Sequence, residues 1–133
     1  MQASTNRIIA TVVGTLYLIA GIVGWLTTAH QGFFATSGGL LVGAFGVNSF
    51  HNMLNILIGA ALLLAGLSTF TAAKIVTTLT GTFCLVLGLF GLFVIGGPVN
   101  VLALNGADNV LHFASAVLLL AVGMGAERSA RND

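Results

Sequence analysis

Three side chains that could take part in chemistry, His51, Asp108 and His112, lie in two short polar motifs of an otherwise apolar chain. Asp108 and His112 are four residues apart, so on a helix they share one face. There the carboxylate could hold the imidazole in one tautomer, as carboxylates beside metal-bound histidines do. Two histidines and one carboxylate can bind zinc or another transition metal. If the fold brings the two motifs together, these three residues form a candidate metal site.

The same motifs also suit a structural role. Asn48 and Asn105 are typical N-cap residues, and a carboxylate at Asp108 favours a helix N-terminus through its charge. Polar side chains at such positions can tie membrane helices together. We favour this interpretation, because there is no His-Glu-x-x-His motif and Cys84 is the single cysteine. The predicted polar cluster comprises Asn48, His51, Asn52, Asn55, Asn105, Asp108, Asn109 and His112.

Other chemistry has less support in the sequence. His51 and His112 could hold a haem axially, but they are the one pair available. Tyr17 lies in the middle of an apolar run, where we expect its hydroxyl to bond a neighbouring backbone carbonyl or threonine. No nucleophile–base pair, phosphate-binding loop or paired carboxylate is visible. We therefore expect a protein that is not an enzyme and has no cofactor.

The composition predicts a protein embedded in a membrane. Hydrophobic residues make up 57% of the chain and charged residues 5%, whereas a soluble domain has about 25% charged residues. From Ile8 to Ala73 there is no Asp, Glu, Lys or Arg, and about 20 apolar residues suffice for one crossing. The lipid bilayer is thus the expected partner. A net charge of +1 argues against nucleic acid, which requires a basic patch.

Glycine, proline and polar residues divide the apolar sequence into four segments. We expect one transmembrane domain over residues 1–133, folded as an all-α, integral membrane four-helix bundle. The predicted helices span about 6–28, 49–69, 74–95 and 106–126. A tight turn at 71–73 would join the second and third helices. The segment 29–47 is too apolar to be simply solvated, so it either lies at the membrane surface or packs over the bundle.

The four helices are predicted to form two tandem helical-hairpin repeats. Arg7 aligns with Lys74 in the first and third helices, and Asn48 aligns with Asn105 in the second and fourth. Both hairpins then enter the membrane from the same side, related by a pseudo-two-fold axis along its normal. Small residues allow membrane helices to approach closely. We expect the first and third helices to pack together through Thr11, Gly14, Thr15, Leu18, Gly21, Thr78, Gly81, Thr82, Leu85 and Gly88.

In the second and fourth helices the polar motifs share a face with small residues, so we expect them to point into the bundle. The basic residues indicate the orientation. Arg7, Lys74, Arg128 and Arg131 all fall at one end of the predicted bundle. The positive-inside rule then places both termini in the cytoplasm and both polar motifs at the external surface. We predict a multi-pass protein of the plasma membrane.

The spacing of the two motifs resembles a known family. The patterns are N-x-x-H-N-x-L-N from Asn48 and N-x-x-D-N-x-L-H from Asn105. They are similar to those of small four-helix membrane proteins, widespread in actinobacteria, that are catalogued as a domain of unknown function. The resemblance covers most of the chain. It implies four helices with an Asn/Asp/His motif in the second and fourth, and it implies no activity.

Two functional hypotheses follow from these features. The first is a non-enzymatic accessory or scaffold component that acts through helix–helix contacts, as a homo-oligomer or in a larger membrane complex. Its basis is the small-residue stripes and the lack of catalytic groups. The alternative is binding of a small ligand or metal ion at the external Asn/Asp/His cluster, or transport through it by an oligomer.

Overall fold

Four long helices make up most of the protein, whose computed structural model describes residues 4–125. In chain order the elements are α1 (Thr5–Thr28), β1 (Gly39–Leu41), β2 (Phe45–Val47), α2 (Ser49–Leu67), α3 (Phe70–Val94) and α4 (Gly106–Gly123). Each helix is long and apolar enough to cross a membrane. The predicted fold class, an all-α membrane bundle of four helices, is confirmed, and the internal sequence repeat stays a prediction.

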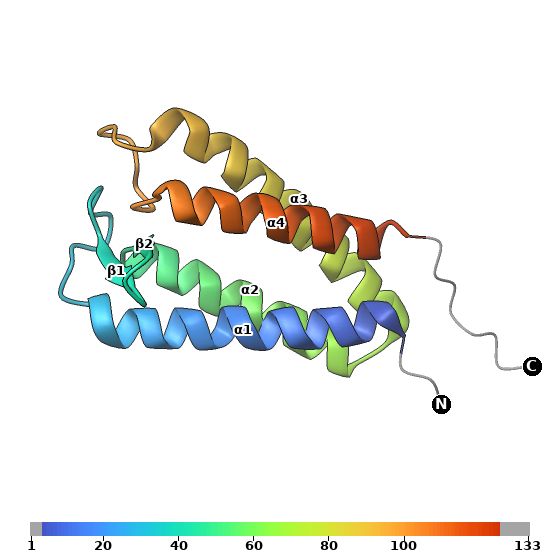
Figure 1. Ribbon diagram of the computed structural model, residues 1–133. Coiled ribbons are helices and arrows are strands. Elements are labelled where there is room, and N and C mark those ends of the chain that lie inside the picture. The colour runs from blue at the N-terminus through green and yellow to red at the C-terminus, as the bar shows by residue number, and fades with distance from the viewer. Residues whose placement is uncertain (1–3, 126–133) are drawn as a thin grey trace, which may run out of the picture.

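The helices form two antiparallel pairs that lie side by side (Figure 1). α1 packs mainly against α2, and α3 packs mainly against α4. The start of α1, the α2–α3 turn and the end of α4 share one end of the bundle. The two short strands and the α3–α4 connection lie at the opposite end, where α2 and α4 begin (Figure 1). The two polar motifs are thus brought to the same end.

The predicted tight turn at 71–73 is wrong. α3 begins at Phe70, and its N-cap is Thr69, whose hydroxyl accepts a hydrogen bond from the Ala72 backbone nitrogen at 3.1 Å. This cap satisfies one of the free N–H groups of the first turn, so the helix starts four residues earlier than predicted. At the other extreme, α4 ends at Gly123. Residue 126, together with Arg128 and Arg131, lies outside the described residues.

The segment 29–47 packs over the end of the bundle and contains a β-hairpin that was not predicted. Gly39 pairs with Val47 and Leu41 with Phe45 in antiparallel register. The turn between the strands places Val42 and Gly43 at φ 48° and 73°. Hairpin turns with two positive φ values usually carry Asn-Gly or Asp-Gly. A valine in this position, with strands of three residues each, explains why the sequence pattern did not reveal the hairpin.

The small-residue stripes pack within each helical pair, so the expected packing of α1 on α3 through them is wrong. A Cβ on Gly14 of α1 would lie 2.5 Å from the Leu63 backbone nitrogen of α2. A Cβ on Gly81 of α3 would lie 2.9 Å from the Leu120 backbone nitrogen of α4. The partner helices carry glycines of their own, which allow the two backbones to approach closely. These interfaces therefore hold each pair together.

Two basic side chains bind helix C-termini at the end opposite the strands. Arg7 donates from Nε to the Gly66 carbonyl oxygen at 3.0 Å, near the end of α2. Lys74 donates from Nζ to the Gly125 carbonyl oxygen at 3.1 Å, just beyond α4. Free carbonyls at a helix C-terminus attract such cations. Arg7 and Lys74 thus lie at the same end of the bundle, as predicted.

Candidate functional site

The site is built at the first turns of α2 and α4. Asn48 is the N-cap of α2, and its Oδ1 accepts a hydrogen bond from the His51 backbone nitrogen at 2.8 Å. Asn105 is the N-cap of α4, and its Oδ1 accepts from the Asp108 nitrogen at 3.1 Å. Asp108 Oδ2 accepts from the Asn105 nitrogen at 2.8 Å, which completes a capping box. The predicted N-cap role of the two asparagines is confirmed.

The same three side chains fasten the loops above the helices. Asn48 Nδ2 donates to the carbonyl oxygens of Ala35 and Val101 at 2.9 and 2.8 Å. Asn105 Nδ2 donates to the Ala44 carbonyl oxygen at 2.8 Å. The Gly46 backbone nitrogen of β2 donates to Asp108 Oδ2 at 3.0 Å. Loop backbone therefore finds hydrogen-bond partners in the helix caps.

Asn52 and Asn109 serve the interfaces within the helical pairs. Asn52 Nδ2 donates to the Thr28 hydroxyl at 2.9 Å. Its Oδ1 has no hydrogen-bond partner, and it lies where a Cβ on Gly24 of α1 would be. Asn109 Oδ1 is likewise without a partner and occupies the corresponding place at Gly91 of α3. Each amide oxygen thus faces a glycine Cα, where a weak C–H···O contact is available.

His51 is held by two backbone carbonyls. Its Nδ1 lies 3.1 Å from the Gly46 oxygen of β2 and 3.1 Å from the Leu102 oxygen of the α3–α4 connection. A nitrogen that faces two acceptors must carry the proton, so Nδ1 is the donor. The His51 ring lies beside that of His112, with 5.8 Å between their centroids and 41° between their planes. The fold therefore brings together one histidine from each motif.

The predicted Asp108–His112 pair does not form. Asp108 Oδ2 is used by the Gly46 and Asn105 nitrogens, and within residues 4–125 no hydrogen bond joins this carboxylate to His112. His112 is buried, and its Nδ1 has no hydrogen-bond partner. Instead, the carboxylate accepts a hydrogen bond from the loop backbone and so fastens the β-hairpin to α4. The tautomer of His112 is therefore not set by Asp108.

The metal hypothesis gains no support from this geometry. No group of three His, Cys, Asp or Glu side chains in the described part of the chain is arranged to hold a metal ion. His51 also uses Nδ1 for backbone carbonyls, so Nε2 is the ring nitrogen that it could offer to a metal. The arrangement of His51, Asp108 and His112 is better suited to hydrogen bonding.

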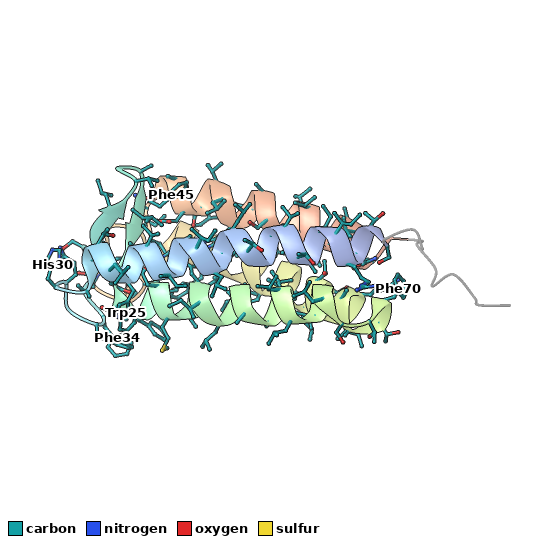
Figure 2. The ribbon with its side chains drawn as sticks, turned by 90° about the horizontal axis from the view of Figure 1, so that it is seen from below. Trp25, His30, Phe34, Phe45 and Phe70 are labelled. Carbon is teal, nitrogen blue, oxygen red and sulfur yellow. The ribbon has the colours of Figure 1, made fainter. Side chains whose placement is uncertain are left out.

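A cavity of about 530 Å³ opens beside the two histidines, between α1 and α4. Aliphatic side chains of both helices form its walls, and the β-hairpin covers one end with Val42 and Phe45. Figure 2 shows Phe45 at this end of the bundle, beside the first turns of α4. The polar residues that line it are Tyr17, His51, Asn55, Asp108, His112 and Ser115.

Two of these polar lining residues were not predicted to belong to the site. Tyr17 of α1 donates a hydrogen bond to the Ser115 hydroxyl of α4 at 2.9 Å, and its hydroxyl also lies 3.6 Å from Cys84 Sγ of α3. The expected bond to a neighbouring backbone carbonyl or threonine is wrong. Ser115 follows His112 by three residues, so it lies on the same helix face. That spacing is the signal that could have identified it.

A family model matches residues 7–125, which is most of the chain, and it is described as a domain of unknown function, DUF4383. The chain belongs to this family. No curated protein and no solved structure matches it. Membership in DUF4383 agrees with the resemblance seen in the two motifs and carries no activity. The four apolar helices of this DUF4383 member indicate a multi-pass membrane protein.

Proposed function

We propose that the protein is a non-enzymatic membrane protein that binds a small, lipid-soluble ligand in the cavity between α1 and α4. The cavity is the observation that carries this proposal. Its volume of about 530 Å³ lies within the range of small-molecule pockets, which are mostly apolar with a few placed polar groups. Aliphatic walls with two histidines among the lining residues fit that description.

The position of the opening supports entry from the bilayer. Leu16 and Ile19 of α1 and Leu118 of α4 line the cavity and are also exposed on the outside of the bundle. Exposed aliphatic side chains in the middle of a membrane helix face lipid. A molecule dissolved in the bilayer would therefore reach the cavity between α1 and α4 without crossing water.

An accessory or scaffold role is the second candidate, and it has less support. Its basis was the small-residue stripes, but Gly14 and Gly21 of α1 face α2, and Gly81 and Gly88 of α3 face α4. Glycines used within the protein are not available to a partner. A homo-oligomer or larger complex would have to use the exposed aliphatic surface of the bundle.

We also propose a plasma-membrane location with both termini in the cytoplasm. The support is that Arg7 and Lys74 lie at the same end. Single cysteines at Ser37 and Ser68, in a Cys84→Ala background, probe opposite ends. In intact cells an impermeant thiol reagent should label Ser37→Cys and leave Ser68→Cys unlabelled. Labelling of Ser68→Cys alone would reverse the orientation.

The ligand proposal is tested by filling the cavity. Ala20 of α1 lines the cavity, whereas Ala61 of α2 is exposed and does not line it. A diazirine-bearing alkane in lipid nanodiscs should cross-link to buried lining residues such as Tyr17 and Ser115. Ala20→Phe should abolish these cross-links, and the matched control Ala61→Phe should retain them. Absence of cross-links in the wild-type protein, or equal cross-linking in both variants, would refute the proposal.

A further inference from the structure

We propose that the ligand is an uncharged amphiphile whose hydroxyl head group bonds to His112 Nδ1, while its apolar tail leaves the cavity between α1 and α4. This inference rests on the proposed function and specifies the chemistry of the ligand. Three observations carry it: a polar atom without a partner, the hydrogen bonds already made by polar side chains around it, and the charge of the cavity lining.

The first observation is the unsatisfied nitrogen of His112. The side chain is 2% exposed and lines the cavity, and its Nδ1 has no hydrogen-bond partner. Buried polar groups in folded proteins almost always have a partner, because an unmade hydrogen bond is costly. Asn52 Oδ1 and Asn109 Oδ1 also lack partners, but each faces a glycine within a helical pair. Of these three residues, only His112 lines the cavity.

The second observation is that four of the five other polar side chains lining the cavity, those of Tyr17, His51, Asp108 and Ser115, already make hydrogen bonds. The Tyr17 hydroxyl donates to Ser115 Oγ, and Asp108 Oδ2 accepts two backbone hydrogen bonds. His51 donates from Nδ1 toward two carbonyls. His112 Nδ1 is an acceptor in one neutral tautomer and a donor in the other. A hydroxyl can both donate and accept, so it satisfies either tautomer, whereas a carbonyl satisfies one.

The third observation is the charge of the lining. Among the lining residues of the described chain there is no lysine or arginine, and Asp108 alone carries a formal charge. Arg7 and Lys74 bind helix C-termini at the opposite end of the bundle. A phosphate or carboxylate head would therefore meet no cation and would be repelled by Asp108. An uncharged hydroxyl head fits this environment, as in long-chain alcohols, sterols and quinols.

The test compares three photoreactive probes of equal chain length in phosphatidylcholine nanodiscs: hexadecanol, hexadecanoic acid and hexadecane, each with a diazirine in the chain. Cross-links to Tyr17, Ser115 and neighbouring buried lining residues are counted. A hydrogen bond as strong as those between membrane helices should favour binding of a probe that makes it by about three- to tenfold over a matched probe that does not. Hexadecanol should exceed both other probes by about that factor, and excess unlabelled hexadecanol should compete with it.

Two variants locate the head-group contact. His112→Leu should lower hexadecanol cross-linking to the level of hexadecane and leave hexadecane unchanged. His112→Asn should keep most of the preference, because the amide places a polar atom near the position of Nδ1. Gel filtration checks that both variants are folded. If His112→Leu does not fold, the wild-type probe comparison and His112→Asn decide the question.

The two proposals fail in distinguishable ways. Without cross-links to the cavity from any probe, the proposed function is wrong. If hexadecane and hexadecanol label the cavity equally, with no effect of His112→Leu, the cavity binds apolar molecules and the head-group assignment is wrong. Higher labelling by hexadecanoic acid than by hexadecanol would also overturn the assignment.

Discussion

The two interfaces that α1 makes with α2 and with α4 are built in different ways. Toward α2, the helix presents Gly14, Gly21 and Gly24, and the backbones of the two helices are in direct contact. Toward α4, it presents larger side chains, among them Leu16 and Tyr17, and a cavity remains. The first interface is closed by the absence of side chains, and the second is kept open by their presence. In lipid, where burial of apolar surface gives no drive to association, this difference separates a structural interface from the proposed binding site.

The β-hairpin contributes to the open interface. β1 contacts α1, and β2 contacts α4, so the hairpin bridges the two helices at the end that holds the polar motifs. It is attached to the start of α4 by the hydrogen bonds from the Gly46 nitrogen to Asp108 Oδ2 and from Asn105 Nδ2 to the Ala44 oxygen. β2 also contacts α2, where His51 Nδ1 lies 3.1 Å from the Gly46 oxygen. The α1–α4 interface therefore depends on contacts between loops and helix caps as well as on helix packing.

The largest effect is expected from a methyl group in the closed interface. In Gly21→Ala the Cβ would lie 2.7 Å from the Ile56 backbone nitrogen and 2.8 Å from the Asn52 carbonyl oxygen. Backbone atoms cannot move aside without separating the helices, so the free energy of unfolding should fall by about 3 kcal/mol, the upper part of the overpacking range. Unfolding by dodecyl sulfate in mixed micelles measures it.

Gly106→Ala is the matched control for Gly21→Ala. Gly106 is the first residue of α4, and a Cβ there would meet nothing within 4 Å. The free energy of unfolding should change by less than about 0.5 kcal/mol. Equal effects of the two substitutions would mean that close approach of α1 and α2 is not what stabilises the pair.

An intermediate effect is expected where the hairpin is fastened to α4. Asp108→Asn replaces a carboxylate that accepts from the Gly46 and Asn105 nitrogens at 3.0 and 2.8 Å. Hydrogen bonds to charged groups are the stronger ones, so the free energy of unfolding should fall by about 2 kcal/mol. A spin label at the exposed Val42 should become more mobile. Unchanged label mobility would show that Asp108 does not hold the hairpin.

The smallest effect is expected in the open interface itself. Tyr17→Phe removes the hydrogen bond to Ser115 that crosses from α1 to α4. Hydrogen bonds between membrane helices contribute about 0.6 kcal/mol on average, and the free energy of unfolding should fall by about that amount. A double-mutant cycle with Ser115→Ala isolates the pair. A loss as large as that of Gly21→Ala would contradict the distinction between the two interfaces.

Local features of the sequence were sufficient to predict the four helices and the burial of the polar motifs. Runs of apolar residues determine which segments cross a membrane, because each span must satisfy its own backbone. Asn48 and Asn105 mark helix starts, since capping depends on neighbours three residues away. Asn52, Asn109 and His112 share faces with small residues and are buried, as the helical period indicated.

Only the tertiary structure decided which partner each of these residues meets. Gly24 and Asn52 are far apart in the chain, as are Gly46 and Asp108, and no periodicity relates them. Asp108 Oδ2 accepts from the Gly46 and Asn105 nitrogens, and His112 Nδ1 has no hydrogen-bond partner. The cavity exists because α1 and α4 approach less closely than the helices of each pair. These outcomes depend on non-local packing, which the helical period of a single chain segment does not contain.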